Sequence, residues 1–192
     1  MPPSTRTYVA KVGTILLVLG CLSLTSCAPD ERLSMAKPTP SSTPLFASEE
    51  EALEAARATY EGFLRTTETV LADGGKGVER IDEFAAASLA ASEREGAQGF
   101  QDKNFRIEGN SSIVAFEMQR FSPEARGDRA VVVAYVCVDD SNIRIFNSDG
   151  EFDRPAGTVG QSTYEANFSL ASGETNRLML STNEIWNGEG IC

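Results

Sequence analysis

The feature that most restricts the fold is an apolar run in the second half of the chain. Residues 129–138 read RAVVVAYVCV, with apolar side chains at both odd and even positions. Successive side chains of a strand point to opposite faces of a sheet, so a strand of this kind is stable only when both faces are covered. The run therefore predicts a central strand with structure on each side of it.

Helical patterns precede this strand. Ser48, followed by three glutamates that end at Glu51, has the pattern of a capping box, and the glutamates suit the positive end of a helix dipole. Apolar or small residues then recur at helical spacing until Asp73-Gly74-Gly75 ends the helix. They are Leu53, Ala56, Tyr60, Phe63, Leu64, Thr67 and Leu71.

A second helix is expected from Val78 to about Glu93, and Gly96 and Gly99 mark its exit. Its apolar face would comprise Val78, Ile81, Phe84, Ala85, Ser88 and Leu89.

Strand patterns fill the rest of the chain. Besides residues 129–138, strands are expected at 105–108, at 112–121, at 142–146 after a kink at 139–141, and in a hairpin of 163–171 with 177–186. Residues 122–128 form a loop and residues 147–150 a turn. Helices followed by strands predict an α+β domain, with the helices packed on one antiparallel sheet.

The first 26 residues have the layout of an export signal. Arg6 and Lys11 supply the positive start, and the apolar run at 12–24 is too short for a comfortable membrane span. Residues 24–27, Leu-Thr-Ser-Cys, resemble the lipobox of bacterial lipoproteins. The resemblance implies cleavage before Cys27 and a diacylglycerol thioether on its sulfur. A plain secretory signal with an incidental cysteine, or an uncleaved anchor helix, are the alternatives.

Residues 27–47 then form an expected tether, because four prolines lie among Ser and Thr residues. Such a segment favours an extended chain, which at ~3.1 Å per residue reaches up to ~60 Å from the bilayer. Lipid and tether together predict a domain (48–192) displayed on the extracytoplasmic side of the cell membrane.

The cysteine count leads to a disulfide. The chain has four cysteines; Cys21 would leave with the signal and Cys27 would carry the lipid, which leaves Cys137 and Cys192. An even remainder outside the cytoplasm favours a bridge, here between the central strand and the last residue. Two unrelated buried thiols are the alternative.

Charge and the absence of histidine narrow the function. The net charge of −11 becomes −13 once Arg6 and Lys11 are removed, and such a surface repels nucleic acid. A chain without histidine cannot build Ser-His-Asp or Cys-His sites and lacks the usual zinc ligand. An enzyme is thus less favoured than a binding protein, and no cofactor or metal is expected.

Short motifs indicate a family. Residues 136–141 read VCVDDS, residues 147–150 read NSDG, and Trp186 and Cys192 follow near the end. These motifs resemble a group of actinobacterial lipoproteins with an NTF2-like (SnoaL-like) domain, and the resemblance covers residues 48–192. It implies two N-terminal helices on a curved antiparallel sheet, in a cone that encloses a pocket. Residues 187–190 after Trp186 depart from the pattern, which leaves the length of the last strand open.

Aromatic residues supply the expected pocket lining, although the same spacing also suits an ordinary core. They are Tyr60, Phe63, Phe84, Phe116, Tyr135 and Trp186. An isomerase-like site would need a carboxylate base and an acid donor facing that cavity. Glu117, Tyr60 and Tyr135 are the nominal residues, and Glu117 is better placed on the solvated face.

An acidic cluster near the middle of the chain invites a calcium interpretation. Its members are Asp139, Asp140, Asn147, Asp149, Glu151 and Asp153. The EF-hand spacing is absent, and turn chemistry explains Asx residues beside Gly, so we expect turns rather than a metal site.

These features favour a lipid-anchored, non-enzymatic binding or assembly module of the cell envelope, with an envelope protein or a second copy as partner. The alternative is a pocket protein or a weak isomerase- or dehydratase-like enzyme that acts on a small apolar ligand. An open cavity with a few convergent polar groups would favour the alternative, whereas a filled cavity and an exposed apolar patch would favour the module.

Overall fold

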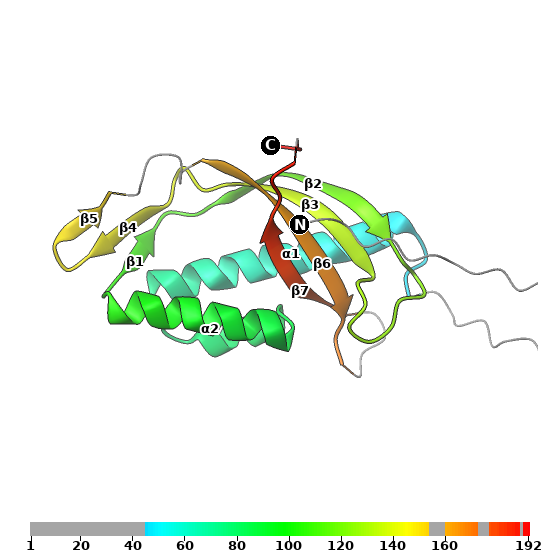
Figure 1. Cartoon of the computed structure of the whole chain (residues 1–192), viewed down its shortest axis with the longest axis horizontal. Coiled ribbons are helices and arrows are strands. Elements are labelled where there is room, and N and C mark those ends of the chain that lie inside the picture. Colours follow the sequence, from blue (N-terminus) through cyan, green and yellow to red (C-terminus); the bar gives the residue numbers. More distant parts are fainter. Residues whose placement is uncertain (1–44, 154–159, 173–176, 189) are drawn as a thin grey trace, which may run out of the picture. The chain divides into compact units, whose positions relative to one another are not determined.

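Helices precede two antiparallel sheets in the computed structural model, which describes residues 45–153, 160–172, 177–188 and 190–192 (Figure 1). The expected α+β class, with helices first, is confirmed. The single sheet that was expected is wrong, because the strands divide into a four-stranded and a three-stranded sheet. Within the described residues the strands do not close into a barrel, and none of the helices is long and apolar enough to cross a membrane. The expected signal and Cys27 lie outside the described residues.

Helix α1 (Glu49–Ala72) begins at the predicted cap. The Ser48 hydroxyl accepts a hydrogen bond from the Glu51 backbone at 3.2 Å, and the Glu51 carboxylate accepts one from Ala47 N at 2.6 Å. Phe46, which the sequence places in the tether, is buried in the core. This apolar side chain therefore packs with the domain before α1 begins.

The predicted second helix is wrong as a single element. A 3-10 helix, η1 (Val78–Glu83), is followed by a break and then by α2 (Ala87–Asp102). The break forms because the backbone turns aside to pair with a strand: Leu180 N donates to Phe84 O, and Ala86 N donates to Leu180 O, each at 2.8 Å. Gly96 and Gly99 do not end α2, since both lie inside it.

The larger sheet has the order β2-β3-β6-β7. Its strands are β2 (Ser112–Phe121), β3 (Val132–Asp139), β6 (Gln161–Leu170) and β7 (Leu178–Ile185). The predicted hairpin of β6 and β7 is confirmed, and β3 is a central strand as expected, although it starts three residues later than the apolar run.

A smaller sheet has the order β1-β4-β5. It contains β1 (Arg106–Glu108), β4 (Arg144–Asn147) and β5 (Gly150–Phe152). Strand β5 was not predicted, because its three residues are all exposed and show no alternation of apolar and polar side chains.

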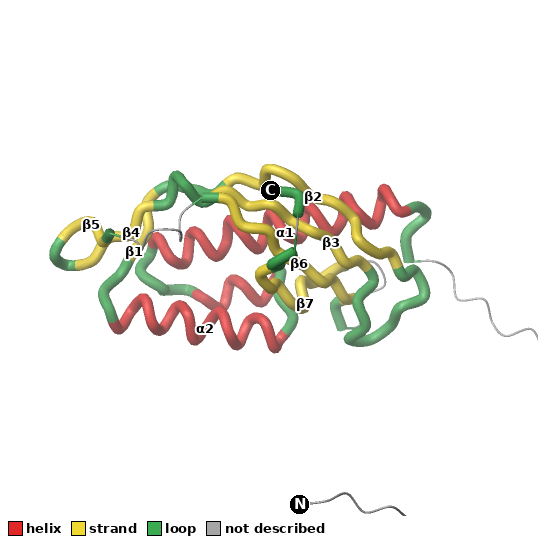
Figure 2. The backbone as a smooth tube through the Cα atoms, turned by 45° about the horizontal axis from the view of Figure 1, so that its top comes forward, coloured by secondary structure: helices red, strands yellow, loops and turns green. Residues whose placement is uncertain are grey.

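The helices lie on one side of the larger sheet, which we call the inner face (Figure 2). Alternate β3 residues Val132, Ala134 and Val136 belong to the same apolar core as Tyr60 and Phe63 of α1. Buried residues of the neighbouring strands complete this layer: Phe116, Ala166, Phe168 and Leu180.

The outer face of β3 is covered by the C-terminal segment. Cys137 forms the predicted disulfide with Cys192, with the two Cα atoms 5.2 Å apart. Nearby, the rings of Tyr135 and Trp186 pack with centroids 4.9 Å apart. The prediction of a strand covered on both faces is confirmed, and the second cover is the end of the chain.

Candidate functional site

A partly enclosed cavity of about 410 Å³ lies between α1, α2 and the two sheets. This volume is within the range of small-molecule sites. Its apolar lining consists of Phe63, Leu64, Leu71, Phe100, Ile107, Val138, Ile143 and Ile145. A second, smaller cavity of about 150 Å³ shares Thr67, Leu71, Glu93 and Phe100 with it, so the two are neighbours along the groove between the helices.

Glu93 of α2 is the most unusual polar residue in this lining. It is only partly exposed, and burial raises the pKa of its carboxyl group. It has no hydrogen-bond or ion-pair partner among the described residues. Partial burial without a partner disfavours the ionised form of a carboxyl group. A group with such a perturbed pKa in a cavity is a candidate for contact with a ligand.

Tyr60 and Asn183 form a polar pair across the cavity from α1 to β7. The Tyr60 hydroxyl donates to the Asn183 side-chain oxygen at 3.3 Å. Burial raises the pKa of Tyr60, with smaller contributions from Tyr164 and Glu93, and the phenol therefore stays protonated at physiological pH. The Asn183 amide keeps two N–H donors that this bond does not use.

Tyr164 of β6 is a second phenol in the lining. Burial raises its pKa, and the nearby Asp140 carboxylate raises it further. Its hydroxyl makes no hydrogen bond with a described residue. It is thus a protonated group able to donate to or accept from a bound molecule.

Thr67 adds a buried hydroxyl that is left without a partner in the described part of the chain. In two other threonines of α1 the hydroxyl donates a hydrogen bond to the carbonyl four residues earlier: Thr59 to Ala55 O at 2.9 Å and Thr69 to Arg65 O at 2.8 Å. An unpaired buried hydroxyl costs about 1–3 kcal/mol, so a ligand atom that pairs with Thr67 would recover part of that cost.

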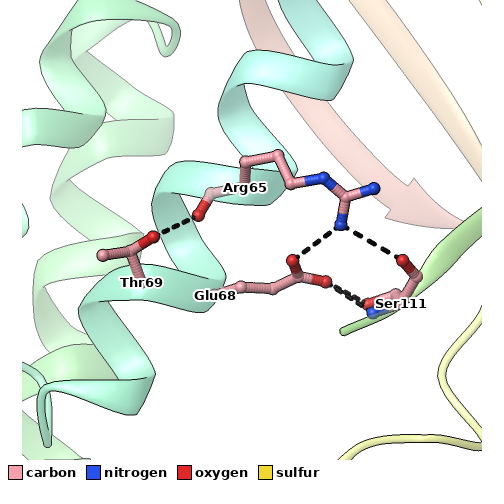
Figure 3. Close-up of polar contacts among 4 residues, drawn as sticks. All are labelled: Arg65, Glu68, Thr69 and Ser111. Atoms are coloured by element: carbon pink, nitrogen blue, oxygen red, sulfur yellow. Dashed lines mark hydrogen bonds and ion pairs between the residues drawn. The ribbon is translucent and has the colours of Figure 1, made fainter. Parts of the chain in front are cut away.

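Glu68 and Ser111, which line the cavity, belong to an ionic cluster with Arg65 (Figure 3). The Glu68 side chain is buried and accepts two hydrogen bonds of 2.7 Å, from the backbone N and the hydroxyl of Ser111. Arg65 pairs with Glu68 at 2.9 Å and also donates to Ser111 O at 3.2 Å. These bonds hold α1 against the residue that precedes β2. The Arg65 guanidinium also compensates the charge of the Glu68 carboxylate.

Only two of the six expected pocket residues, Tyr60 and Phe63, line the cavity. Phe116 is buried in the core, where it contacts Tyr60 edge-on with centroids 6.0 Å apart. Phe84 packs over Gly62 in the break between η1 and α2. These two rings do not line this cavity. Core spacing does not distinguish a packed ring from one that faces a void.

Tyr135 and Trp186 do not line this cavity either, since they pack together on the outer face. Glu117 pairs with Tyr135 in the sheet and is exposed, so this carboxylate and Tyr135 do not face the cavity. Of the three nominal acid–base residues, only Tyr60 lies there.

The acidic cluster at 139–153 makes turns. Asp139 accepts hydrogen bonds from both the backbone and the hydroxyl of Ser141, which lower its pKa, and Asn147 accepts from Asp149 N at 2.9 Å. No group of three or more potential metal ligands gathers in the described part of the chain.

Glu93 could have been found from the sequence. With α2 placed at 87–102, Ala90, Glu93, Ala97 and Phe100 follow the spacing of one helix face, and a carboxylate interrupts that apolar stripe. Because the helix was predicted to end near residue 93, the stripe was not recognised.

Comparison with known proteins adds little. No family model matches the chain, and no curated protein matches it. A de novo designed β-sheet protein solved by solution NMR is similar at 16% identity and a TM-score of 0.29, over 73% of this chain and 95% of that chain. A likeness at this level carries no argument about fold or function.

Proposed function

We propose that this chain is a lipid-anchored, extracytoplasmic binding protein of NTF2-like fold, whose cavity holds a small, mainly apolar molecule with a polar group. One observation carries the proposal. Glu93, Tyr164 and Thr67 line a cavity with apolar and polar walls, and they find no hydrogen-bond partner among the described residues. Apolar walls with a few convergent polar groups are typical of ligand sites.

The family and location rest on separate support. Helices that precede antiparallel sheets, with a cavity between them, fit the architecture that the NTF2-like resemblance implies. The Cys137–Cys192 disulfide fits an oxidising compartment, as the export signal and the lipobox-like residues before Cys27 require.

The surface gives less support to an assembly module. The large apolar side chains that are exposed in the described residues are Val114, Phe152 and Ile185. Val114 and Ile185 lie on β2 and β7, at opposite edges of the larger sheet, and Phe152 lies on the smaller sheet. Scattered apolar residues are ordinary, whereas a docking surface needs a contiguous patch.

Binding is favoured over catalysis because nothing orients Glu93. A catalytic base is normally held in place by a hydrogen bond from a neighbouring group. Among the described residues Glu93 has no such bond, so the carboxyl group is free to follow a ligand.

The test is to fill the cavity. In Leu71→Trp, an indole enters the space that both cavities share. Ala72→Trp is the matched control, since Ala72 is the next residue of α1 and is exposed. The full chain, purified in a non-ionic detergent, is titrated with neutral cyclic alcohols and ketones while its thermal unfolding is followed by circular dichroism.

A ligand at 100 times its Kd stabilises the folded state by about 2.7 kcal/mol. We expect Tm to rise for the wild type and for Ala72→Trp, and not for Leu71→Trp. Equal responses of the three proteins, or no response of any, would refute the proposal.

A further inference from the structure

The charged side chains that line the cavity are all acidic. Its lining contains the carboxylates of Glu68, Glu93 and Asp140, and it contains neither lysine nor arginine. Glu68 is neutralised by Arg65, and Asp140 accepts a hydrogen bond of 2.7 Å from Gly160 N. Glu93 is thus the acid of this lining whose charge no described residue compensates.

Aromatic rings accompany this carboxyl group. Tyr60 and Phe63 of α1, Phe100 of α2 and Tyr164 of β6 line the same cavity. The face of an aromatic ring carries partial negative charge and attracts cations, more strongly where water is excluded. Carboxylate and rings therefore favour the same sign of ligand charge.

We propose that the cavity takes a lipophilic cation, with an ammonium group beside Glu93 and an apolar body against the aliphatic side chains. This inference rests on the proposed function. An anion would meet three carboxylates with no basic side chain in the lining, and a neutral ligand would leave Glu93 without a charge partner.

A bound cation would also stabilise the ionised form of Glu93 in its half-buried place. An isolated buried carboxylate is costly, whereas one paired with an ammonium group is compensated. The other titratable groups facing the cavity are Tyr60, Tyr164, Glu68 and Asp140. Both phenols stay neutral near pH 7. Burial raises the pKa of Glu93, and an ammonium group beside it would lower that pKa again.

The test compares two ligands of the same shape. Adamantan-1-amine is protonated at neutral pH and adamantan-1-ol is neutral, so their difference measures the preference for charge. Calorimetric titration of the full chain in non-ionic detergent gives both affinities. We expect the amine to bind about tenfold more tightly than the alcohol, in the range of a desolvated cation–π contact. The preference should increase as the pH rises through the pKa of Glu93.

Glu93→Gln keeps the shape of the side chain and removes its charge, and Glu95→Gln on the exposed side of α2 is the matched control. We expect Glu93→Gln to reduce the preference to within about twofold and Glu95→Gln to retain it. If the alcohol binds as tightly as the amine, or if the preference for the amine survives in Glu93→Gln, the inference of a cationic ligand is refuted and the proposed binding function is retained. If neither ligand binds, both proposals fail.

Discussion

Removing the disulfide should destabilise the domain by an amount that follows from its position in the chain. Cys137 and Cys192 are 55 residues apart, and the chain-entropy relation gives about 4 kcal/mol for a loop of this size at 25 °C. Cys192→Ser is the variant of choice, since Cys192 is exposed whereas Cys137 is fully buried. A serine at position 137 would add the separate cost of a buried hydroxyl group.

Urea unfolding of the full chain measures this loss. With an m-value of about 2 kcal/mol/M, a loss of 4 kcal/mol lowers the midpoint by about 2 M. The fluorescence of Trp186, the single tryptophan, reports whether the C-terminal segment leaves Tyr135 at the same time.

Reduction provides the control, because reduced wild type should unfold at the midpoint of Cys192→Ser and reductant should not affect the variant. A midpoint for Cys192→Ser within about 0.5 M of the oxidised wild type would refute the account, since at the same m-value it corresponds to only about 1 kcal/mol.

Four further variants test the helices and the cavity. Gly99→Ala should raise the free energy of unfolding by about 1 kcal/mol through helix propensity, because its Cβ meets nothing within 4 Å. Gly62→Ala should lower the free energy of unfolding by about 1–3 kcal/mol, because its Cβ would lie 2.1 Å from the Phe84 ring and overpack the site. Denaturation of both variants checks the opposite signs. Glu68→Gln should lose about 1.5–3 kcal/mol by removing the charge from the buried contact before β2, measured in the same way. Burial raises the pKa of Glu93, so its contribution to stability is present below the unfolded-state pKa and is lost as pH rises through the folded-state pKa. The free energy of unfolding of the wild type should therefore fall relative to Glu93→Gln over that interval, and parallel pH profiles would contradict the shift.

The regular elements could be predicted where a local pattern determines them. The Ser48 cap, the bounds of β2 and the two-sided burial of β3 each follow from a few consecutive residues. The break between η1 and α2 could not, because it forms through backbone bonds to Leu180, about a hundred residues later in the chain. Such pairing is a tertiary effect that helix periodicity does not record.

The cavity was harder to predict than the fold. Periodicity places an aromatic residue on a face but does not say whether the opposite element fills the space in front of it. Phe116 and Phe63 both lie on the inner side, yet only Phe63 borders the cavity. A charged residue on an apolar stripe, as Glu93 is on α2, is the more specific signal, because burying it needs a reason.

The alternation of β3 places the disulfide and the cavity on opposite faces of the strand. Cys137 faces outward to Cys192, while the next residue, Val138, faces the cavity. The neighbouring strand repeats this arrangement: Thr163, paired with Cys137, is buried next to the C-terminal segment, while Tyr164 lines the cavity. Loss of the disulfide should therefore loosen the outer cover without changing the cavity walls. We expect Cys192→Ser to keep its affinity for adamantan-1-amine within about twofold, or about 0.4 kcal/mol, at a temperature where it remains folded. A larger loss would mean that the C-terminal cover sets the position of β3 and β6, and that the two faces are coupled.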